Sequence, residues 1–211
     1  MSVSPPDRRT ILRLVLSTSA LAVGWGRAAI ASEITVPVEQ LHAGLMAIMK
    51  AGKTASFGQR YETIAPVIGR TFDLEVILRQ VIGPRLALLP SDQQAALADA
   101  FRRYTIASYV ANFDSYSGQH FEIVPAVRAV GNDRVVETRI ASPAGRGNEL
   151  DYVLRQEGGG WKVVDVLADG AISRVASQRS EMRSLLADGG GPGLLVSLRQ
   201  KTAELSGGIL Q

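Results

Sequence analysis

The chain has 211 residues, a formal net charge of +3 and no cysteine. Without cysteine it has no disulfide framework, no thiolate metal site and no attachment point for a lipid anchor. The first 31 residues hold four arginines and one aspartate, which leaves 19 basic residues of 23 and 19 acidic residues of 20 in the remainder. The remainder is therefore neutral. It shows no local basic patch and gives no reason to expect a nucleic-acid surface.

The N-terminal segment is typical of a cleavable export signal. Three arginines within residues 8–13 precede an apolar run over 14–25 that is too short to span a bilayer, and Ala29-Ile30-Ala31 matches a small-x-small cleavage site. We predict a signal peptide over residues 1–31. Because two of the arginines are adjacent, it fits either an ordinary secretory (Sec) signal or a twin-arginine signal. The remaining residues, 32–211, suit one exported, soluble domain.

The first half of the exported chain has apolar residues at helical spacing. The pattern predicts a helix that follows Val36-Pro37 and ends near Gly52, a second over 57–69, a short third that starts after Asp73 and stops before Gly83-Pro84, and a long fourth from Ser91 to about Tyr116. Pro66 predicts a kink or an early end of the second helix. Asp73 is a suitable N-cap, and Ser91 with Gln94 has the spacing of a capping box.

From residue 120 the spacing changes to the alternation of strands. We predict strands over about 120–130, 134–142, 150–156 and 161–168. The short, turn-rich connections over 131–133, 143–148 and 158–160 favour a four-strand antiparallel meander. Pro125 places the first strand at an edge or a bend. Strict alternation would put Val164 and Val166 on one face of the fourth strand.

The C-terminal part returns to helical spacing after the turn Asp169-Gly170. The glycines over 189–193, with Pro192 among them, predict a division into two helices. A phosphate loop is the weaker interpretation of these glycines, because they follow a helix and no Lys-Ser or Lys-Thr pair comes after them. Helices, a meander and further helices make an α+β domain.

Few residues suggest catalysis. The two histidines, His42 and His120, lack metal-binding spacing, and no Gly-x-Ser-x-Gly segment occurs. We assign both to surface or structural roles and expect no catalytic residue, no metal site and no cofactor. Asp151 and Asp165 share strand faces with charged or exposed residues, so we expect solvated carboxylates there. Asp169 is interpreted as a turn residue.

Four segments are informative together because they occur in a fixed order. They are Phe101-Arg102-Arg103-Tyr104 to Tyr109, Tyr116-Ser117-Gly118-Gln119, Trp161-Lys162-Val163-Val164-Asp165-Val166, and residues 189–198. They resemble the MlaC, or toluene-tolerance, family of periplasmic lipid-shuttle proteins of Gram-negative bacteria. Asp169-Gly170-Ala171-Ile172-Ser173 followed by Arg179-Ser180-Glu181 resembles the branch named HpnM, which is associated with hopanoid biosynthesis. The family's usual Gly-Val-Ser is one residue longer here, which suggests a different cargo.

The resemblance implies a bent antiparallel sheet of four or slightly more strands, with helices around a deep apolar lipid pocket. Acyl chains would occupy the pocket, the headgroup would stay at its mouth, and no reaction would occur. The cargo would be phospholipid or hopanoid. The protein would be a periplasmic monomer that exchanges lipid with an inner-membrane ABC-type transporter complex and an outer-membrane lipoprotein complex, and it would approach membranes only transiently.

The apolar pattern supplies candidates for the pocket lining. We predict Phe72, Ile77, Val81, Leu86, Phe101, Tyr104, Tyr109, Tyr152, Val164 and Val166 as lipid-binding residues. Two other functions stay open. One is a secreted enzyme of lipid metabolism that uses His120 with a nearby acid. The other is an accessory scaffold of a lipid or hopanoid pathway, with a filled core, that binds partners through the helices of residues 176–206.

Overall fold

The computed structural model describes residues 23–143 and 145–210. Its elements are α1 (Val23–Ala51), the 3-10 helix η1 (Gly52–Thr54), α2 (Phe57–Thr71), α3 (Leu74–Ile82), the 3-10 helix η2 (Gly83–Leu88), α4 (Ser91–Asn112), β1 (His120–Val130), β2 (Asp133–Ser142), β3 (Gly145–Glu157), β4 (Gly160–Ala168), β5 (Ile172–Ser173) and α5 (Arg174–Leu205). The first 22 residues of the predicted export signal lie outside the described residues. No helix in the described part is long and apolar enough to cross a bilayer.

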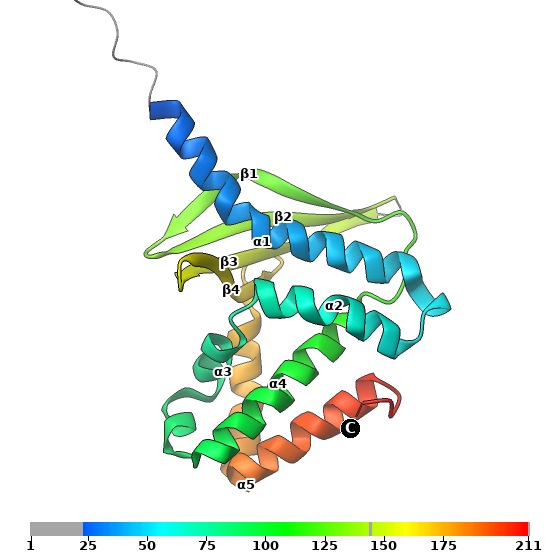
Figure 1. Ribbon diagram of the computed structural model, residues 1–211, viewed down its shortest axis with the longest axis vertical. Helices are drawn as coiled ribbons and strands as arrows, with labels where there is room; N and C mark the ends of the chain where they lie inside the picture. Colours follow the sequence, from blue (N-terminus) through cyan, green and yellow to red (C-terminus); the bar gives the residue numbers. More distant parts are fainter. Residues whose placement is uncertain (1–22, 144, 211) are drawn as a thin grey trace, which may run out of the picture.

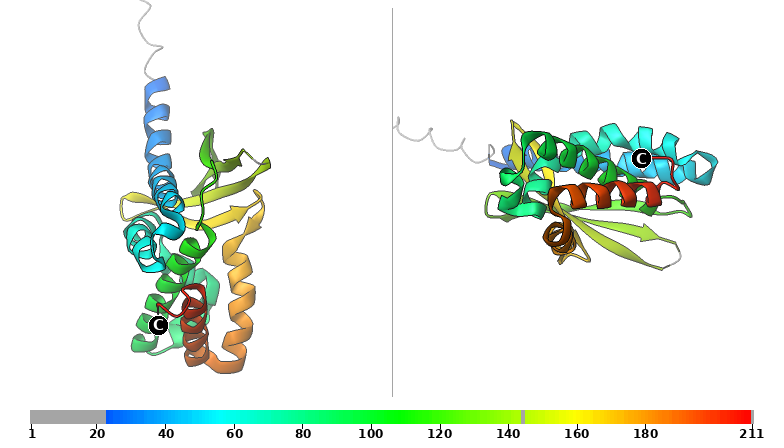
Figure 2. Two further views of the ribbon diagram at one scale, coloured as in Figure 1. Left: turned by 90° about the vertical axis from the view of Figure 1, so that its right-hand side faces the viewer. Right: turned by 90° about the horizontal axis from the view of Figure 1, so that it is seen from below.

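The strands form one antiparallel sheet in the order β1-β2-β3-β4-β5, which is also their order along the chain. The predicted meander and the α+β class are therefore confirmed, with β5 as an added short strand. Helix α1 runs across the sheet and packs against β1, β2 and β4, and α2 lies beside α1. Helices α3, α4 and α5 extend away from the sheet (Figures 1 and 2). The core lies between α1, α2, α3, α4, the sheet and α5.

Two register shifts change which side chains share a face. In β1 the pairing with β2 shifts between Ile123 and Val127, around Pro125, so the predicted irregular edge strand is confirmed. In β4 the shift was not predicted. Leu154 pairs with Val163 whereas the preceding Val153 pairs with Asp165, so Val164 is an extra, bulged residue. Strict alternation along β4, which put Val164 with Val166, is therefore wrong.

Several predicted boundaries differ from the structure. Helix α1 begins at Val23 and includes Pro37, so it starts well before the predicted position. Helix α2 continues past Pro66 to Thr71, so the proline does not end it early. Helix α4 ends at Asn112 instead of near Tyr116, because Phe113 leaves helical geometry and its ring lies 6.0 Å from Tyr109 and 6.3 Å from Phe121.

Strand β3 begins at Gly145, inside the segment predicted as a loop. This is possible because Gly147 allows the two backbones to approach closely. A Cβ atom at position 147 would lie 2.5 Å from the carbonyl oxygen of Ile140 on β2. The last part of the predicted loop, from Gly145 on, is thus a strand that requires a glycine at position 147.

The predicted capping box at Ser91 is wrong. Pro90 is the N-cap of α4, its carbonyl accepts the Gln94 N–H, and the Gln94 amide donates to the carbonyl of Leu89 at 2.8 Å. The box occurs instead at α2. There Ser56 Oγ accepts from the Gln59 N–H at 3.2 Å, and Gln59 Oε1 accepts from the Ser56 N–H at 2.8 Å. The predicted N-cap Asp73 is confirmed.

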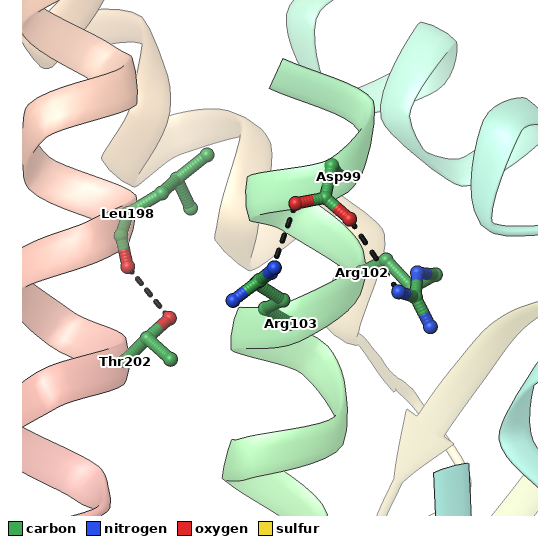
Figure 3. A network of polar contacts seen from close by, with 5 residues as sticks. All are labelled: Asp99, Arg102, Arg103, Leu198 and Thr202. Carbon is green, nitrogen blue, oxygen red and sulfur yellow. Dashed lines mark hydrogen bonds and ion pairs between the residues drawn. The ribbon is translucent and has the colours of Figure 1, made fainter. Parts of the chain in front are cut away.

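The predicted division of the C-terminal helix is confirmed. Gly190 has φ 60° and ψ −155°, which breaks α5 into two arms. The second arm returns beside α4, and Lys201 Nζ on it lies 2.6 Å from Glu181 Oε1 on the first arm. Figure 3 shows the second arm, with Thr202, facing the part of α4 where Asp99 pairs with Arg102 and Arg103.

The two serines give a matched stability test. We expect Ser56→Ala to lower the free energy of unfolding by about 1 kcal/mol, because the backbone N–H of Gln59 in the first turn of α2 loses its acceptor, Ser56 Oγ. Ser91→Ala should change it by less than about 0.5 kcal/mol, because Ser91 caps nothing. Urea unfolding of the two variants and the parent measures both. An equal loss in both variants would contradict the placement of the capping box.

Candidate functional site

A cavity of about 340 Å³ lies between α3, α4, the sheet and the start of α5. Its wall is formed by Phe72, Leu74, Ile77, Phe101, Tyr104, Thr105, Ser108, Tyr109, Asn112, Phe113, Leu150, Asp165, Val166, Ala168, Arg174, Val175 and Gln178. Most of these side chains are apolar or aromatic. Polar groups are few and come mainly from α4 and from the first turns of α5. Such a combination is characteristic of a ligand pocket.

Helix α4 supplies the largest part of the wall. The lining residues on it lie three or four positions apart, so they share one face of the helix: Phe101, Tyr104, Thr105, Ser108, Tyr109 and Asn112. Ser108 Oγ donates to the carbonyl of Tyr104 at 2.8 Å, so its polar group is satisfied within the helix. Thr105 Oγ1 is buried and has no hydrogen-bond partner among the described residues.

Aromatic rings in the wall pack against one another and against further rings behind the wall. The Tyr109 ring lies 5.6 Å from that of Phe72, and Phe113 connects Tyr109 to Phe121 on β1. Phe121 stacks on His42 of α1 at 4.3 Å, and His42 lies 5.6 Å from Tyr152 of β3. These rings form a continuous series of contacts from the cavity to Tyr152 on the sheet.

Burial sets the protonation of this series. It lowers the pKa of His42 to about 4, so the imidazole is neutral at pH 7. Burial also raises the pKa of Tyr109, against the smaller effect of Arg174, and raises the pKa of Tyr152 well above its usual value, with Tyr109 adding to that rise. Both hydroxyls therefore stay protonated at pH 7. The Tyr152 hydroxyl has no hydrogen-bond partner among the described residues.

The two histidines occupy different environments. His42 is 7% exposed and packs in the core, and His120 is exposed at the start of β1, where Nε2 lies 2.9 Å from Glu122 Oε1. Neither contributes to the cavity wall. Within the described part of the chain, no group of three or more His, Cys, Asp or Glu side chains is placed to hold a metal ion.

The expectation of solvated carboxylates on the sheet is wrong for Asp165. This residue accepts hydrogen bonds from the Ser173 hydroxyl and from the Val175 N–H, the latter at 3.1 Å. It therefore ties β4 to the N-terminus of α5, where a negative charge is favourable. Because Val175 lines the cavity, this carboxylate fixes the position of one wall.

The expectation is also wrong for Asp151, which is 7% exposed. Burial raises its pKa, although a hydrogen bond from the Thr138 N–H opposes the rise. Asp169 is a turn residue as predicted, with φ 51°, and its N–H donates to the carbonyl of Glu149 at 3.0 Å. Sequence alternation missed the burial of Asp151 because it cannot show what covers a strand face.

The ten predicted pocket residues separate into two groups. Six line the cavity: Phe72, Ile77, Phe101, Tyr104, Tyr109 and Val166. The other four are buried elsewhere. Val81, Leu86 and Tyr152 belong to the main core, and Val164 is buried at the bulge of β4 outside that core. Whether the six contact a ligand stays a prediction.

Sequence reasoning missed the polar part of the wall. Thr105, Ser108 and Asn112 follow from the spacing of Phe101 and Tyr104 once α4 is known to face a cavity. Arg174 and Gln178 had no such signal, because only the packing of α5 beside α4 brings them to the site.

Comparisons with known proteins agree with this geometry. The model of the MlaC protein family matches residues 39–200. A phospholipid-binding protein from Ralstonia solanacearum, solved in complex with a phospholipid, has a similar structure, with a TM-score of 0.72 and 19% sequence identity. The match covers 82% of this chain and 99% of that one. A search of curated proteins returns no match.

The buried imidazole predicts a pH dependence of stability. The folded-state pKa of His42 is about 4, below the ordinary value of 6.5, so between these pH values the unfolded chain binds more protons. The stability that neutral His42 contributes is therefore full above pH 6.5 and is lost as the pH falls toward 4. The loss is on the order of 3 kcal/mol.

Urea unfolding of the parent and of His42→Phe, from about pH 7.5 to about pH 4, tests this effect. The difference in unfolding free energy between the parent and His42→Phe should fall below pH 6.5, because only the parent must protonate this site on unfolding. A pH-independent difference for His42→Phe would show that the imidazole is not buried as described.

Proposed function

Because the chain belongs to the MlaC family, we propose that it is a non-catalytic carrier that binds a membrane lipid in the cavity and moves it between two membranes. One observation carries the proposal. The face of α4 presents aromatic and small polar side chains to a cavity beside the sheet, where a well-packed core would have none. The fold is shared with a protein that was solved with a phospholipid.

The physical basis is the hydrophobic effect. An acyl chain that leaves a bilayer for water loses about 0.8 kcal/mol of favourable transfer free energy for each methylene. Burial of the chain against Phe101, Tyr109 and Val166 would restore a similar amount. The cavity volume of about 340 Å³ is near the lower end of the range of about 300–1,000 Å³ for ligand pockets. We therefore propose that acyl chains enter while α3 and α5 move apart, and that the headgroup stays outside.

The cargo we favour is phospholipid, and hopanoid is the second candidate. The additional residue in Gly170-Ala171-Ile172-Ser173 is accommodated by β5 and by Ser173 as N-cap of α5, so it lies directly before the cavity wall. A rigid fused-ring lipid would suit the aromatic contacts of Phe72, Tyr109 and Phe113. The identity of the bound lipid distinguishes the two.

We further propose a periplasmic location, reached through the predicted signal peptide, and exchange with an inner-membrane ABC-type complex and an outer-membrane lipoprotein complex. Enzymatic use of His120 is less favoured, because this side chain pairs with Glu122 on an exposed edge and does not line the cavity. A scaffold with a filled core is less favoured because the core contains the cavity. The one carboxylate of the wall, Asp165, is engaged in holding α5.

Filling the cavity should prevent lipid binding. Ser108→Trp places a large ring on the lining face of α4, and Ser91→Trp makes the same change at an exposed position of the same helix. We expect purified Ser108→Trp protein to carry no more than about a tenth of the lipid per protein that the parent carries. A tenfold loss of affinity corresponds to about 1.4 kcal/mol of binding free energy. Ser91→Trp should match the parent.

Solvent extraction followed by mass spectrometry measures the lipid and identifies it as phospholipid or hopanoid. Circular dichroism confirms that both variants are folded. A folded Ser108→Trp protein that carries as much lipid as the parent would refute the cavity as the binding site. A parent protein that neither carries lipid nor takes it up from liposomes would refute the carrier function.

A further inference from the structure

A second concave site lies at the other end of the contact between α3 and α5. We call it the arginine cleft; it encloses about 490 Å³ and is lined by Arg79, Gln80, Val81, Ile82, Gly83, Pro84, Arg85, Arg179, Arg183 and Leu186. The sequence showed no local basic patch, because these arginines come from segments about a hundred residues apart. The fold brings four guanidinium groups together although residues 32–211, these arginines included, carry no net charge.

Each arginine is placed by a specific feature of the backbone. Arg79 lies on the last turn of α3, and Gly83, with φ 75°, ends that helix and leads into η2, which carries Arg85. Arg179 and Arg183 are four residues apart on α5, so they share a face of the helix. Arg179 Nε donates to the carbonyl of Gln80 at 2.8 Å and thereby joins the two sides of the cleft.

The positive charge of the cleft is poorly compensated. Arg79 pairs with Glu75 at 3.7 Å, and both side chains are largely exposed, so this pair screens little charge. In the described part of the chain, neither Arg85 nor Arg183 makes an ion pair, and no carboxylate lines the cleft. Four like charges at one concave site repel one another, which is typical of a site that receives an anion.

We propose that the arginine cleft binds the phosphate group of an anionic phospholipid at a membrane surface. Guanidinium groups present paired donors that match phosphate oxygens, and several together discriminate phosphate from a neutral group. The buried side chains of Val81, Ile82 and Leu186 form an apolar floor for the carbon atoms next to the phosphate. A concave site suits this compact anion better than it suits the broad acidic face of a folded protein.

The position of the cleft relative to the cavity supports a lipid as the occupant. Leu74 and Ile77 of α3 line the cavity, and the residues of α3 that follow line the cleft. On α5 the cavity is lined by Arg174, Val175 and Gln178, and the cleft begins at the next residue, Arg179. Figure 1 shows α3 and α5 side by side away from the sheet. Docking through the cleft would hold this pair of helices against the membrane from which the lipid enters.

This proposal rests on the proposed carrier function, and the test separates the two. The variant R85Q/R183Q removes two charges that have no described ion-pair partner, so it leaves no carboxylate unpaired. The control R70Q/R199Q removes two exposed arginines outside the cleft and gives the same net charge. Lipid carried by each purified protein reports on the cavity, and vesicle cosedimentation reports on the cleft.

We expect the parent and R70Q/R199Q to bind phosphatidylglycerol vesicles at low ionic strength and to bind phosphatidylcholine vesicles weakly. R85Q/R183Q should bind phosphatidylglycerol vesicles roughly thirtyfold more weakly, because each arginine near an anionic surface contributes about a fivefold factor to the dissociation constant. R85K/R183K, which keeps the charge, should bind more tightly than R85Q/R183Q. All four proteins should carry the same amount of lipid.

Equal vesicle binding by R85Q/R183Q and R70Q/R199Q would overturn the proposal. A second pair of results would also overturn it: inorganic phosphate stabilises the parent against thermal unfolding, and R85Q/R183Q leaves vesicle binding unchanged. The cleft would then bind a free anion. If R85Q/R183Q lost binding only to a polyglutamate peptide and kept vesicle binding, the cleft would serve a protein partner and the lipid assignment would be wrong.

Discussion

The contact between aromatic rings is the interaction on which the cavity depends. Five rings contact one another one after the next, at centroid distances from 4.3 to 6.3 Å: Phe72, Tyr109, Phe113, Phe121 and His42. Each such contact contributes about 0.5–1.5 kcal/mol beyond the burial of area. Because these rings rest on one another, they hold α4 in place beside the sheet without filling the space in front of it. The series thus keeps the wall of the cavity open. Small aliphatic side chains in place of these rings would let the wall collapse.

The cavity and the arginine cleft make different use of the same two helices. Near the sheet, Leu74 and Ile77 of α3 and Val175 of α5 give the cavity an apolar wall, with Arg174 and Gln178 beside them. Asp165 fixes the first turn of α5 through Ser173 and Val175. Farther from the sheet the same helices present arginines. A displacement of α5 relative to α3 would therefore alter both sites together. This arrangement connects the proposed docking on a membrane with the proposed entry of a lipid.

The sequence was sufficient for local structure and insufficient for features that depend on packing. Glycine-rich turns predicted the meander, Pro125 predicted the irregular edge strand, and the glycines near Gly190 predicted the break in α5. The apolar pattern found six residues of the cavity wall, four of them on helices. The bulge at Val164, the cap made by Asp165 and the convergence of four arginines were not predicted, because each arises from segments that meet only in the folded chain. The family resemblance supplied the expectation of a pocket, which composition alone could not.

The most direct test of the central claim is an experimental structure of the protein purified with the lipid that we propose it carries. The account predicts continuous acyl-chain density between α4 and the sheet, in contact with Ile77, Tyr109 and Val166. It also predicts that the headgroup lies outside this cavity. Lipid-loaded protein whose lipid density lies elsewhere, with the space beside α4 filled by protein side chains, would contradict it.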